Sequence, residues 1–302
     1  MAHDHGAAGA QRPRLVAAFS ITATILAAEV VGAILTGSLA LTVDAGHLLA
    51  DAAGLGVALL AATLAGRPAT DRRTWGFARA EVLAATAQAA VLLGVGLFVL
   101  VEGIGRLIEP PAVASGPLLA FGVVALVGNL ASIAVLAGAR RSSFNLRAAF
   151  LEVANDALGA LGVIAAAIVI GLTGWQRADA VAAILIGVLI LPRAFVLLRE
   201  TVDVLLESTP AGLDLELVRT HLLQQPHVLA VHDLHASQIA TGLPVLTAHV
   251  TIEDDCFVDG RSSRILDELQ ACVAEHFPVS VEHSTFQLEP ERHRDHEHTP
   301  HR

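Results

Sequence analysis

The stretch DAGHLLADAAGL, residues 44–55, places two aspartates and a histidine inside a long apolar segment. Asp51 follows His47 by four residues, so a helix presents both side chains on one face, about one turn apart. Ionisable side chains are costly inside a bilayer and usually line the path of an ion or substrate. The stretch therefore predicts a membrane helix that carries a functional polar site.

The composition of the whole chain also indicates a membrane protein. Of its 302 residues, 54% are hydrophobic and only 16% are charged, and the mean hydropathy is +0.62. A water-soluble domain is rarely so apolar. A helix needs ~20 mostly apolar residues to cross a bilayer. Six stretches meet this requirement, at about 15–36, 39–64, 82–106, 116–138, 150–172 and 178–199.

The arginines predict the orientation of these helices. Nine of them precede the first span or lie in the loops after the second and fourth spans, whereas the opposite loops hold two. Arginine is enriched on the cytoplasmic side of membrane proteins. We therefore expect a multi-pass protein of the cytoplasmic membrane with both termini in the cytoplasm.

The fifth span repeats the spacing found in the second. In FLEVANDALGAL, residues 150–161, Glu152 and Asp156 are again four residues apart. Two helices that each present a pair of ligands can supply four donors, the coordination number that zinc prefers. The sequence thus predicts a metal site made by His47, Asp51, Glu152 and Asp156.

Other polar residues of the spans have simpler explanations. Asp44 lies one turn before His47, where it either orients the imidazole from outside the ligand set or lies at a solvated helix end. Glu29 and Asn129 are expected to form hydrogen bonds between helices. Glu102 and Asp179 lie near span ends, where solvation accounts for them.

The chain changes character after Pro210. Residues 208–302 hold 6 Arg, 15 Asp and Glu, and 11 of the 14 histidines. Such an acidic, His-rich segment repels nucleic acid and attracts divalent cations. Its hydrophobic pattern predicts an αββαβ, ferredoxin-like α+β domain. The expected elements are a helix at 213–225, strands at 228–239 and 243–253, a helix at 261–277 and a strand at 279–289.

The chain thus divides into four parts. We expect a cytoplasmic N-terminal tail, a six-helix membrane domain, a cytoplasmic domain for metal sensing and dimerisation, and a disordered His-rich tail. Their boundaries are 1–14, 15–207, 208–290 and 291–302.

Several function classes are excluded by missing residues. The chain contains no lysine, which excludes a Walker A phosphate loop and a Schiff-base lysine. No HExxH motif is present, and no nucleophile–base pair accompanies His47, so we expect a transporter and not an enzyme. Cys256 and Cys272 lack CxxC spacing and are expected to be free cytosolic thiols.

Taken together, these motifs resemble the cation diffusion facilitator family, in particular its bacterial zinc, cobalt and cadmium efflux branch. The resemblance implies six membrane helices, a cytoplasmic αββαβ domain, a homodimer and exchange of a divalent metal for protons. It covers nearly the whole chain. The stretches that carry it are GSLALTVDAGHLLADAAGL (37–55), TWGFARAEVLAA (74–85), SFNLRAAFLEVANDALGALGVI (143–164), LLESTP (205–210), VHDLH (231–235) and HSTFQLE (283–289).

The resemblance assigns roles to individual positions. His47, Asp51 and Asp156 match the metal ligands of the family, whereas Glu152 stands where zinc-transporting members usually have histidine. One imidazole with three carboxylates is a harder donor set, which admits Mn²⁺ or Fe²⁺. The family's histidine before the third span is missing here. The positions that resemble its regulatory metal sites are His232, His249 and His283.

The sequence therefore predicts efflux of Zn²⁺, and also of Co²⁺ and Cd²⁺, by proton antiport. Moving two charges outward against roughly 100 mV costs about 4.6 kcal/mol, and each inward proton returns about 2.3 kcal/mol. The expected partners are a second copy of the chain, divalent metal ions, protons and the bilayer, but no nucleic acid. Apart from the cargo, the only expected cofactor is a regulatory Zn²⁺ in the C-terminal domain. The alternatives are a Mn²⁺ or Fe²⁺ exporter and a membrane metal sensor that transports nothing.

Overall fold

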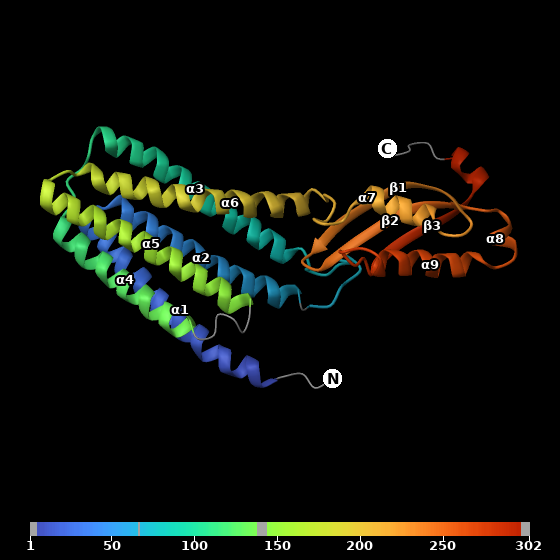
Figure 1. Cartoon of the computed structure of the whole chain (residues 1–302), viewed down its shortest axis with the longest axis horizontal. Helices are drawn as coiled ribbons and strands as arrows, with labels where there is room; N and C mark the ends of the chain where they lie inside the picture. The colour runs from blue at the N-terminus through green and yellow to red at the C-terminus, as the bar shows by residue number, and fades with distance from the viewer. Residues whose placement is uncertain (1–4, 66, 138–143, 297–302) are drawn as a thin grey trace. The chain divides into compact units, whose positions relative to one another are not determined.

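The computed structural model describes residues 5–65, 67–137 and 144–296 (Figure 1). The chain forms two compact units. One comprises Met1–Gly56 and Ala87–Val196, and the other comprises Val57–Thr86 and Leu197–Arg302.

Six long helices precede the C-terminal domain, and they overlap all six predicted spans (Figure 1). Their bounds are α1 (His5–Thr36), α2 (Leu39–Ala65), α3 (Ala80–Ile108), α4 (Ser115–Ala137), α5 (Phe144–Thr173) and α6 (Arg177–Leu205). Among the described residues, four segments are long and apolar enough to cross a membrane: α3, α4, Phe150–Thr173 of α5, and α6. The described part of α1 adds the shorter apolar segment Ser20–Thr36. The predicted helical membrane domain is confirmed.

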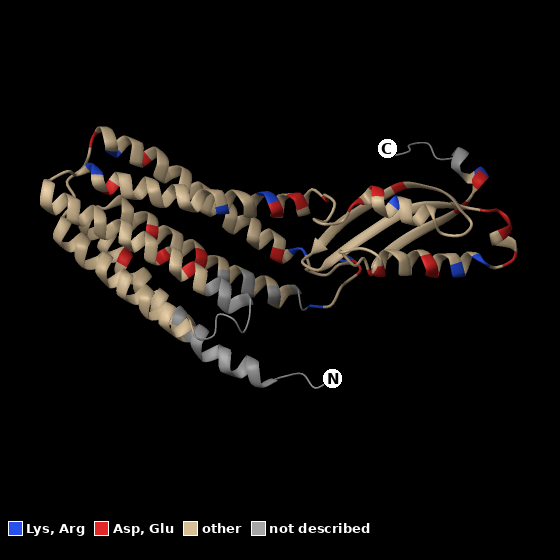
Figure 2. Cartoon of the chain, in the orientation of Figure 1, with Lys and Arg blue, Asp and Glu red and all other residues tan. Residues whose placement is uncertain are grey.

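The helical unit carries large apolar side chains on its outside and small ones where helices meet. Val101 is 74% exposed and Leu172 is 82% exposed, as expected of side chains that face lipid. Small buried residues let the backbones approach closely. Four of these belong to the buried core that joins α5 and α6: Ala166, Ala167, Ala182 and Ala183. Figure 2 shows acidic residues on α1, α2 and α5 against this mostly uncharged background.

The predicted hairpin between α1 and α2 turns at two residues. Gly37 has φ +68°, a left-handed conformation that glycine adopts at low cost. The N-terminus of α2 is then capped by Asp179 of α6. Its carboxylate accepts a hydrogen bond from Ser38 Oγ and another from the backbone N–H of Leu39, at 2.6 Å. Asp179 is 1% exposed, so the expectation that it is solvated was wrong: it satisfies backbone donors that have no partner inside α2.

The C-terminal domain confirms the order αββαβ and adds two short helices. Its strands pair in the order β1–β2–β3, with β1 antiparallel and β3 parallel to β2. The elements are α7 (Leu215–Leu223), β1 (Val228–Ala240), β2 (Leu243–Ile252), α8 (Asp255–Val258), α9 (Ser262–Glu275), β3 (His283–Pro290) and the 3₁₀ helix η1 (Glu291–His296). Residues 291–296 of the expected disordered tail thus form a helix, whereas 297–302 lie outside the described residues.

Strand β3 begins four residues later than expected. The backbone N–H of Val281 donates to the carbonyl of Val273 in α9, at 3.1 Å. Pro278 has no N–H for a ladder bond. The chain therefore first packs against the end of α9 and enters the sheet at His283.

One face of this sheet packs against the helices of the domain. Along β2, alternate side chains face the buried core, namely Leu246, Ala248, Val250 and Ile252. The core also includes side chains of α7 and α9. Because successive side chains of a strand point to opposite faces, His249 lies on the other face of the sheet.

Candidate metal centres

Helices α2 and α5 approach each other closely around the predicted ligands. A Cβ atom added at Gly159 would lie 3.0 Å from Asp44 Oδ1, so a larger residue there would require the Asp44 carboxylate to shift by a few tenths of an ångström. On α2, His47 and Asp51 share one face, and on α5 Glu152 and Asp156 share another. The small residues at this contact allow the polar faces to meet.

The structure brings the four predicted ligands together around the imidazole of His47. Its Nε2 atom lies 3.5 Å from Asp51 Oδ2, 3.6 Å from Glu152 Oε1 and 3.9 Å from Asp156 Oδ1. Ligand atoms of His47, Glu152 and Asp156 all lie within 4.8 Å of one another. His47 and Asp156 are buried, and the other two are half-buried.

Several polar atoms of this site have no hydrogen-bond partner among the described residues. They are His47 Nδ1, Asp51 Oδ2 and Asp156 Oδ1. Buried polar atoms are rarely left in this state, because an unmade hydrogen bond costs about 1–3 kcal/mol. A divalent cation would satisfy the carboxylate oxygens, and the donor set of one imidazole and three carboxylates suits such a cation.

Two further residues contact the ligands, and sequence reasoning missed both. Arg193 of α6 contacts both oxygens of Glu152, with Nη1 at 2.7 Å from Oε1 and 2.5 Å from Oε2. Gln88 of α3 donates a hydrogen bond from Nε2 to Asp51 Oδ1, at 3.3 Å. Neither belongs to a spaced pair of ligands, so the i, i+4 pattern gave no signal for them.

Asp44 is buried inside the helical bundle. It is 2% exposed, which excludes the solvated helix end. His47 Nδ1 makes no hydrogen bond to it among the described residues. Asp44 instead lines a cavity together with His47, Asp156, Gly159 and Arg193.

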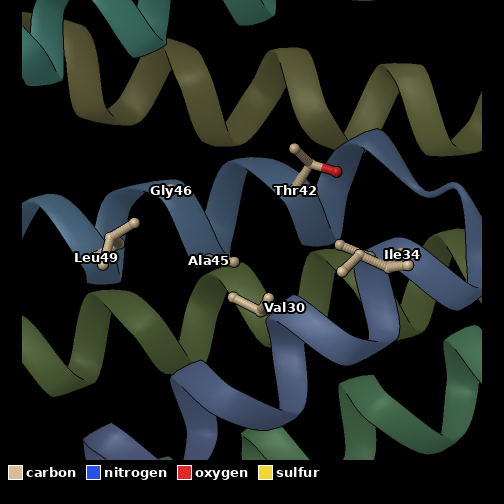
Figure 3. Close-up of a pocket in the computed structure, with 7 residues that line it drawn as sticks. Val30, Ile34, Thr42, Ala45, Gly46 and Leu49 are labelled. Atoms are coloured by element: carbon tan, nitrogen blue, oxygen red, sulfur yellow. The ribbon is translucent and has the colours of Figure 1, made fainter.

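A second hollow, between α1 and α2, is a different kind of surface (Figure 3). Its lining is apolar except for one threonine and contains no ionisable residue. The labelled residues are Val30, Ile34, Thr42, Ala45, Gly46 and Leu49. This hollow is therefore not part of the ion site.

Comparison with known proteins identifies the family. The family model described as "Cation efflux transmembrane domain" matches residues 15–206, and the one described as "Cation efflux protein, cytoplasmic domain" matches residues 210–291. The chain belongs to the cation efflux family, the cation diffusion facilitators. Members of this family are membrane transporters of metal cations and not enzymes.

Relatives match over nearly their whole length. The "Metal cation efflux system protein CzcD" of Cupriavidus metallidurans is 41% identical over 287 residues, which cover 95% of this chain and 89% of that protein. The "Zinc transporter ZitB" of Escherichia coli is 38% identical, with 96% and 93% covered. The "Cadmium, cobalt and zinc/H(+)-K(+) antiporter" of Bacillus subtilis is 36% identical, with 97% and 93% covered.

The cytoplasmic domain of this cation efflux protein holds a second group of ligand-type side chains. His232 of β1 and His249 of β2 are paired across the sheet, with ring centroids 5.4 Å apart. Glu289 of β3 is 1% exposed, and its Oε1 lies 2.8 Å from His249 Nδ1. Its Oε2 lies 3.7 Å from His232 Nε2. Ligand atoms of these three residues lie within 4.8 Å of one another.

This group contains two of the three predicted regulatory ligands. His283 is not among them, because it is paired with Val245, four residues before His249 along β2. Glu289 takes the third place. A sequence signal for it was available: on β3, Glu289 is six residues after His283, an even spacing that keeps both on one face.

A bulge in β1 places His232 and His235 on the same face of the sheet. The register shifts between His232 and His235, and Asp233 has φ +49°. Val231 and Leu234 both face the core, and the residues between them face away from it. An extra residue of this kind bends the strand and redirects side chains. The bulge lets Asp233 Oδ1 approach His235 Nε2 at 3.0 Å on the same side as His249.

Proposed function

We propose that this protein exports Zn²⁺, and also Co²⁺ and Cd²⁺, from the cytoplasm in exchange for protons. The observation that carries the proposal is the convergence of His47, Glu152 and Asp156 from two membrane helices, with ligand atoms within 4.8 Å. The names of the relatives support the choice of cargo. They include a zinc transporter and a cadmium, cobalt and zinc antiporter whose name includes H⁺.

Proton exchange follows from the chemistry of the ligands. Carboxylates and imidazole bind a metal only when they are deprotonated, so metal and protons compete for the same atoms. A cation that enters from the cytoplasm displaces protons. Protonation of His47, Asp51 and Asp156 on the other side of the membrane then releases it. Alternation between two conformations carries the site from one side to the other.

The remaining parts of the proposal concern arrangement and regulation. The distribution of arginines supports cytoplasmic termini in the cell membrane. The cytoplasmic domain is the part by which two copies form a homodimer. His232, His249 and Glu289 would bind a regulatory Zn²⁺ there, which is consistent with a buried carboxylate facing two imidazoles.

Transport by purified full-length protein in liposomes tests the function. Zn²⁺, Co²⁺, Cd²⁺ and Mn²⁺ are compared with and without an imposed pH gradient, and both metal and proton fluxes are recorded. We expect zinc flux that accelerates with the gradient and a matching proton flux in the opposite direction. Metal flux without proton flux would indicate a channel, and no flux of any metal would indicate a sensor.

A second candidate is export of Mn²⁺ or Fe²⁺. Glu152 favours it, because a third carboxylate makes the site harder. Arg193 opposes it, because its positive charge beside Glu152 offsets the charge of the additional carboxylate. The same liposomes decide between the two: faster transport of Mn²⁺ than of Zn²⁺ would favour the second candidate.

A further inference from the structure

A third group of ligand-type side chains lies at one corner of the cytoplasmic domain. His227 precedes β1, Glu253 follows β2, and Cys256 belongs to α8. One ligand atom from each lies within 4.8 Å of the other two. We propose that these three residues form a separate thiolate-containing site for a soft divalent cation such as Zn²⁺ or Cd²⁺.

The backbone holds the three residues together. Val228 is paired with Ile252, so the residues next to them in sequence, His227 and Glu253, also meet. The N–H of Glu253 donates to the carbonyl of His227 at 3.1 Å, and the N–H of Cys256 donates to the carbonyl of Glu253 at 3.0 Å. The side chains continue this contact, with His227 Nδ1 at 2.8 Å from Glu253 Oε2.

The site is open on one side and apolar on the other. The side chains of His227 and Glu253 are 34% and 48% exposed, so an ion can reach them from solvent. Cys256 is fully buried and belongs to the apolar core of the domain. A cation bound here would have the imidazole and carboxylate towards solvent and the sulfur behind it.

The charges balance when a cation binds. Burial raises the pKa of the Cys256 thiol, and the nearby Arg261 guanidinium opposes that shift. Binding displaces the thiol proton to solvent. The resulting thiolate and the Glu253 carboxylate then carry two negative charges, which neutralise a divalent ion. A water molecule would supply the fourth ligand of a tetrahedral site.

Arg261 must change its contact for the imidazole to coordinate a metal. Its Nη1 lies 3.0 Å from His227 Nε2, while its Nε is bound to Asp259 Oδ2 at 2.5 Å. A cation on Nδ1 leaves the ring proton on Nε2, where it faces the Arg261 guanidinium. A cation on Nε2 takes the place of Arg261. Asp259 remains as a partner for the guanidinium in both cases.

The sulfur separates this site from the other two. Thiolate ligands favour soft cations, and neither the membrane site nor the group of His232, His249 and Glu289 contains one. The proposal is independent of transport. A cation here would cross-link the start of β1, the end of β2 and α8, and would stabilise the domain.

Cobalt absorption tests the proposal on the full-length protein in detergent. A thiolate bound to Co²⁺ gives a charge-transfer band in the near ultraviolet, which nitrogen and oxygen ligands do not. We expect this band in the wild-type protein and in Cys272→Ser, a control that removes the other buried cysteine. We expect no band in Cys256→Ser. A wild-type protein without the band, or a band of equal strength in Cys256→Ser, would overturn the site.

Two variants that keep the thiol protect the test against a folding defect. His227→Gln and Glu253→Gln change partly exposed side chains and should weaken Co²⁺ binding by at least about tenfold. His249→Gln, in the other cytoplasmic group, should leave the band unchanged. If both thiol-retaining variants develop the charge-transfer band at the same Co²⁺ concentration as the wild-type protein, His227 and Glu253 do not form the site.

Discussion

At the scale of single residues, the membrane site is balanced for a divalent ion. With its carboxylates ionised, Asp51, Glu152 and Asp156 carry three negative charges, and Arg193 supplies one positive charge at 2.5–2.7 Å from Glu152. The sum of −2 is equal and opposite to the charge of the proposed cargo. Arg193 thus offsets the additional carboxylate that Glu152 brings to the site.

The most direct residue-level prediction concerns Asp156. Asp156→Asn removes a negative charge and a titratable ligand, so we expect metal-dependent proton flux in liposomes to fall by at least about 100-fold. Glu102→Gln is the matched control, because Glu102 is an acidic residue of a membrane helix that pairs with Arg106 outside the site. Wild-type flux in Asp156→Asn would contradict the mechanism.

Arg193 gives a prediction about affinity. Arg193→Gln leaves Glu152 without its cation, so the site should hold divalent metal more tightly and release it more slowly. Because Arg193 is more than half exposed, the ion pair contributes at most about 1 kcal/mol, and KM should fall by about twofold to fivefold. The ratio of Mn²⁺ to Zn²⁺ transport should rise. Arg199→Gln, on the same helix, should change neither quantity, and an unchanged KM in Arg193→Gln would remove the argument.

At the scale of helices and strands, the sequence was sufficient to predict a feature wherever that feature depends on a single pattern, such as apolar length or a fixed spacing. Apolar length predicted the six helices, and the i, i+4 pairs predicted that Asp51, Glu152 and Asp156 lie close to His47. Arg193 was not predictable, since its long side chain reaches Glu152 from a different helix and no spacing relates the two. Nor was the cap by Asp179, which depends on how α6 packs against the start of α2.

The cytoplasmic domain shows the same limit. Element order could be predicted, but the choice between His283 and Glu289 required the register of a parallel strand pair. The bulge at Asp233 interrupts the two-residue period of β1, so the pattern alone could not place His232 and His235 on one face.

The contact between α2 and α5 predicts different tolerance at two glycines of one helix. Gly159→Ala would place a methyl group 3.0 Å from Asp44 Oδ1, whereas the same change at Gly162 meets its nearest neighbour, Ile186, at 3.9 Å. We expect transport to slow severalfold in the first variant and to be preserved in the second. Equal rates in liposomes would show that the helix spacing does not limit the site.

The cap of α2 predicts a loss of stability. Asp179→Ala leaves the N–H of Leu39 and the hydroxyl of Ser38 without their acceptor in a buried place, which should cost about 1–3 kcal/mol. A lower unfolding temperature in detergent is the expected result. Asp203→Ala, which removes an exposed partner of Arg199, should unfold at the wild-type temperature. Identical unfolding of the two variants would argue against the cap.

At the scale of the whole molecule, the described residues combine the proposed cargo site in the membrane unit with two groups of ligand-type side chains in the cytoplasmic domain. If the group of His232, His249 and Glu289 senses cytoplasmic metal, its loss should change when the transporter works and not how fast it can work. His249→Gln should therefore raise the Zn²⁺ concentration for half-maximal transport and leave the maximal rate unchanged. His221→Gln is the control, since His221 lies on α7 against Phe277. A lower maximal rate with unchanged half-saturation would contradict a sensing role.

The burial of both cysteines has a practical consequence. Cys256 and Cys272 are 0% and 1% exposed, so a maleimide reagent added to the folded protein meets no accessible native thiol. A cysteine introduced at Glu109 or at Thr70 would then be the only reactive group, without any need for a cysteine-free background. Labelling of intact cells with a membrane-impermeant reagent would report which of the two loops faces outward, and so the sidedness of the entire protein.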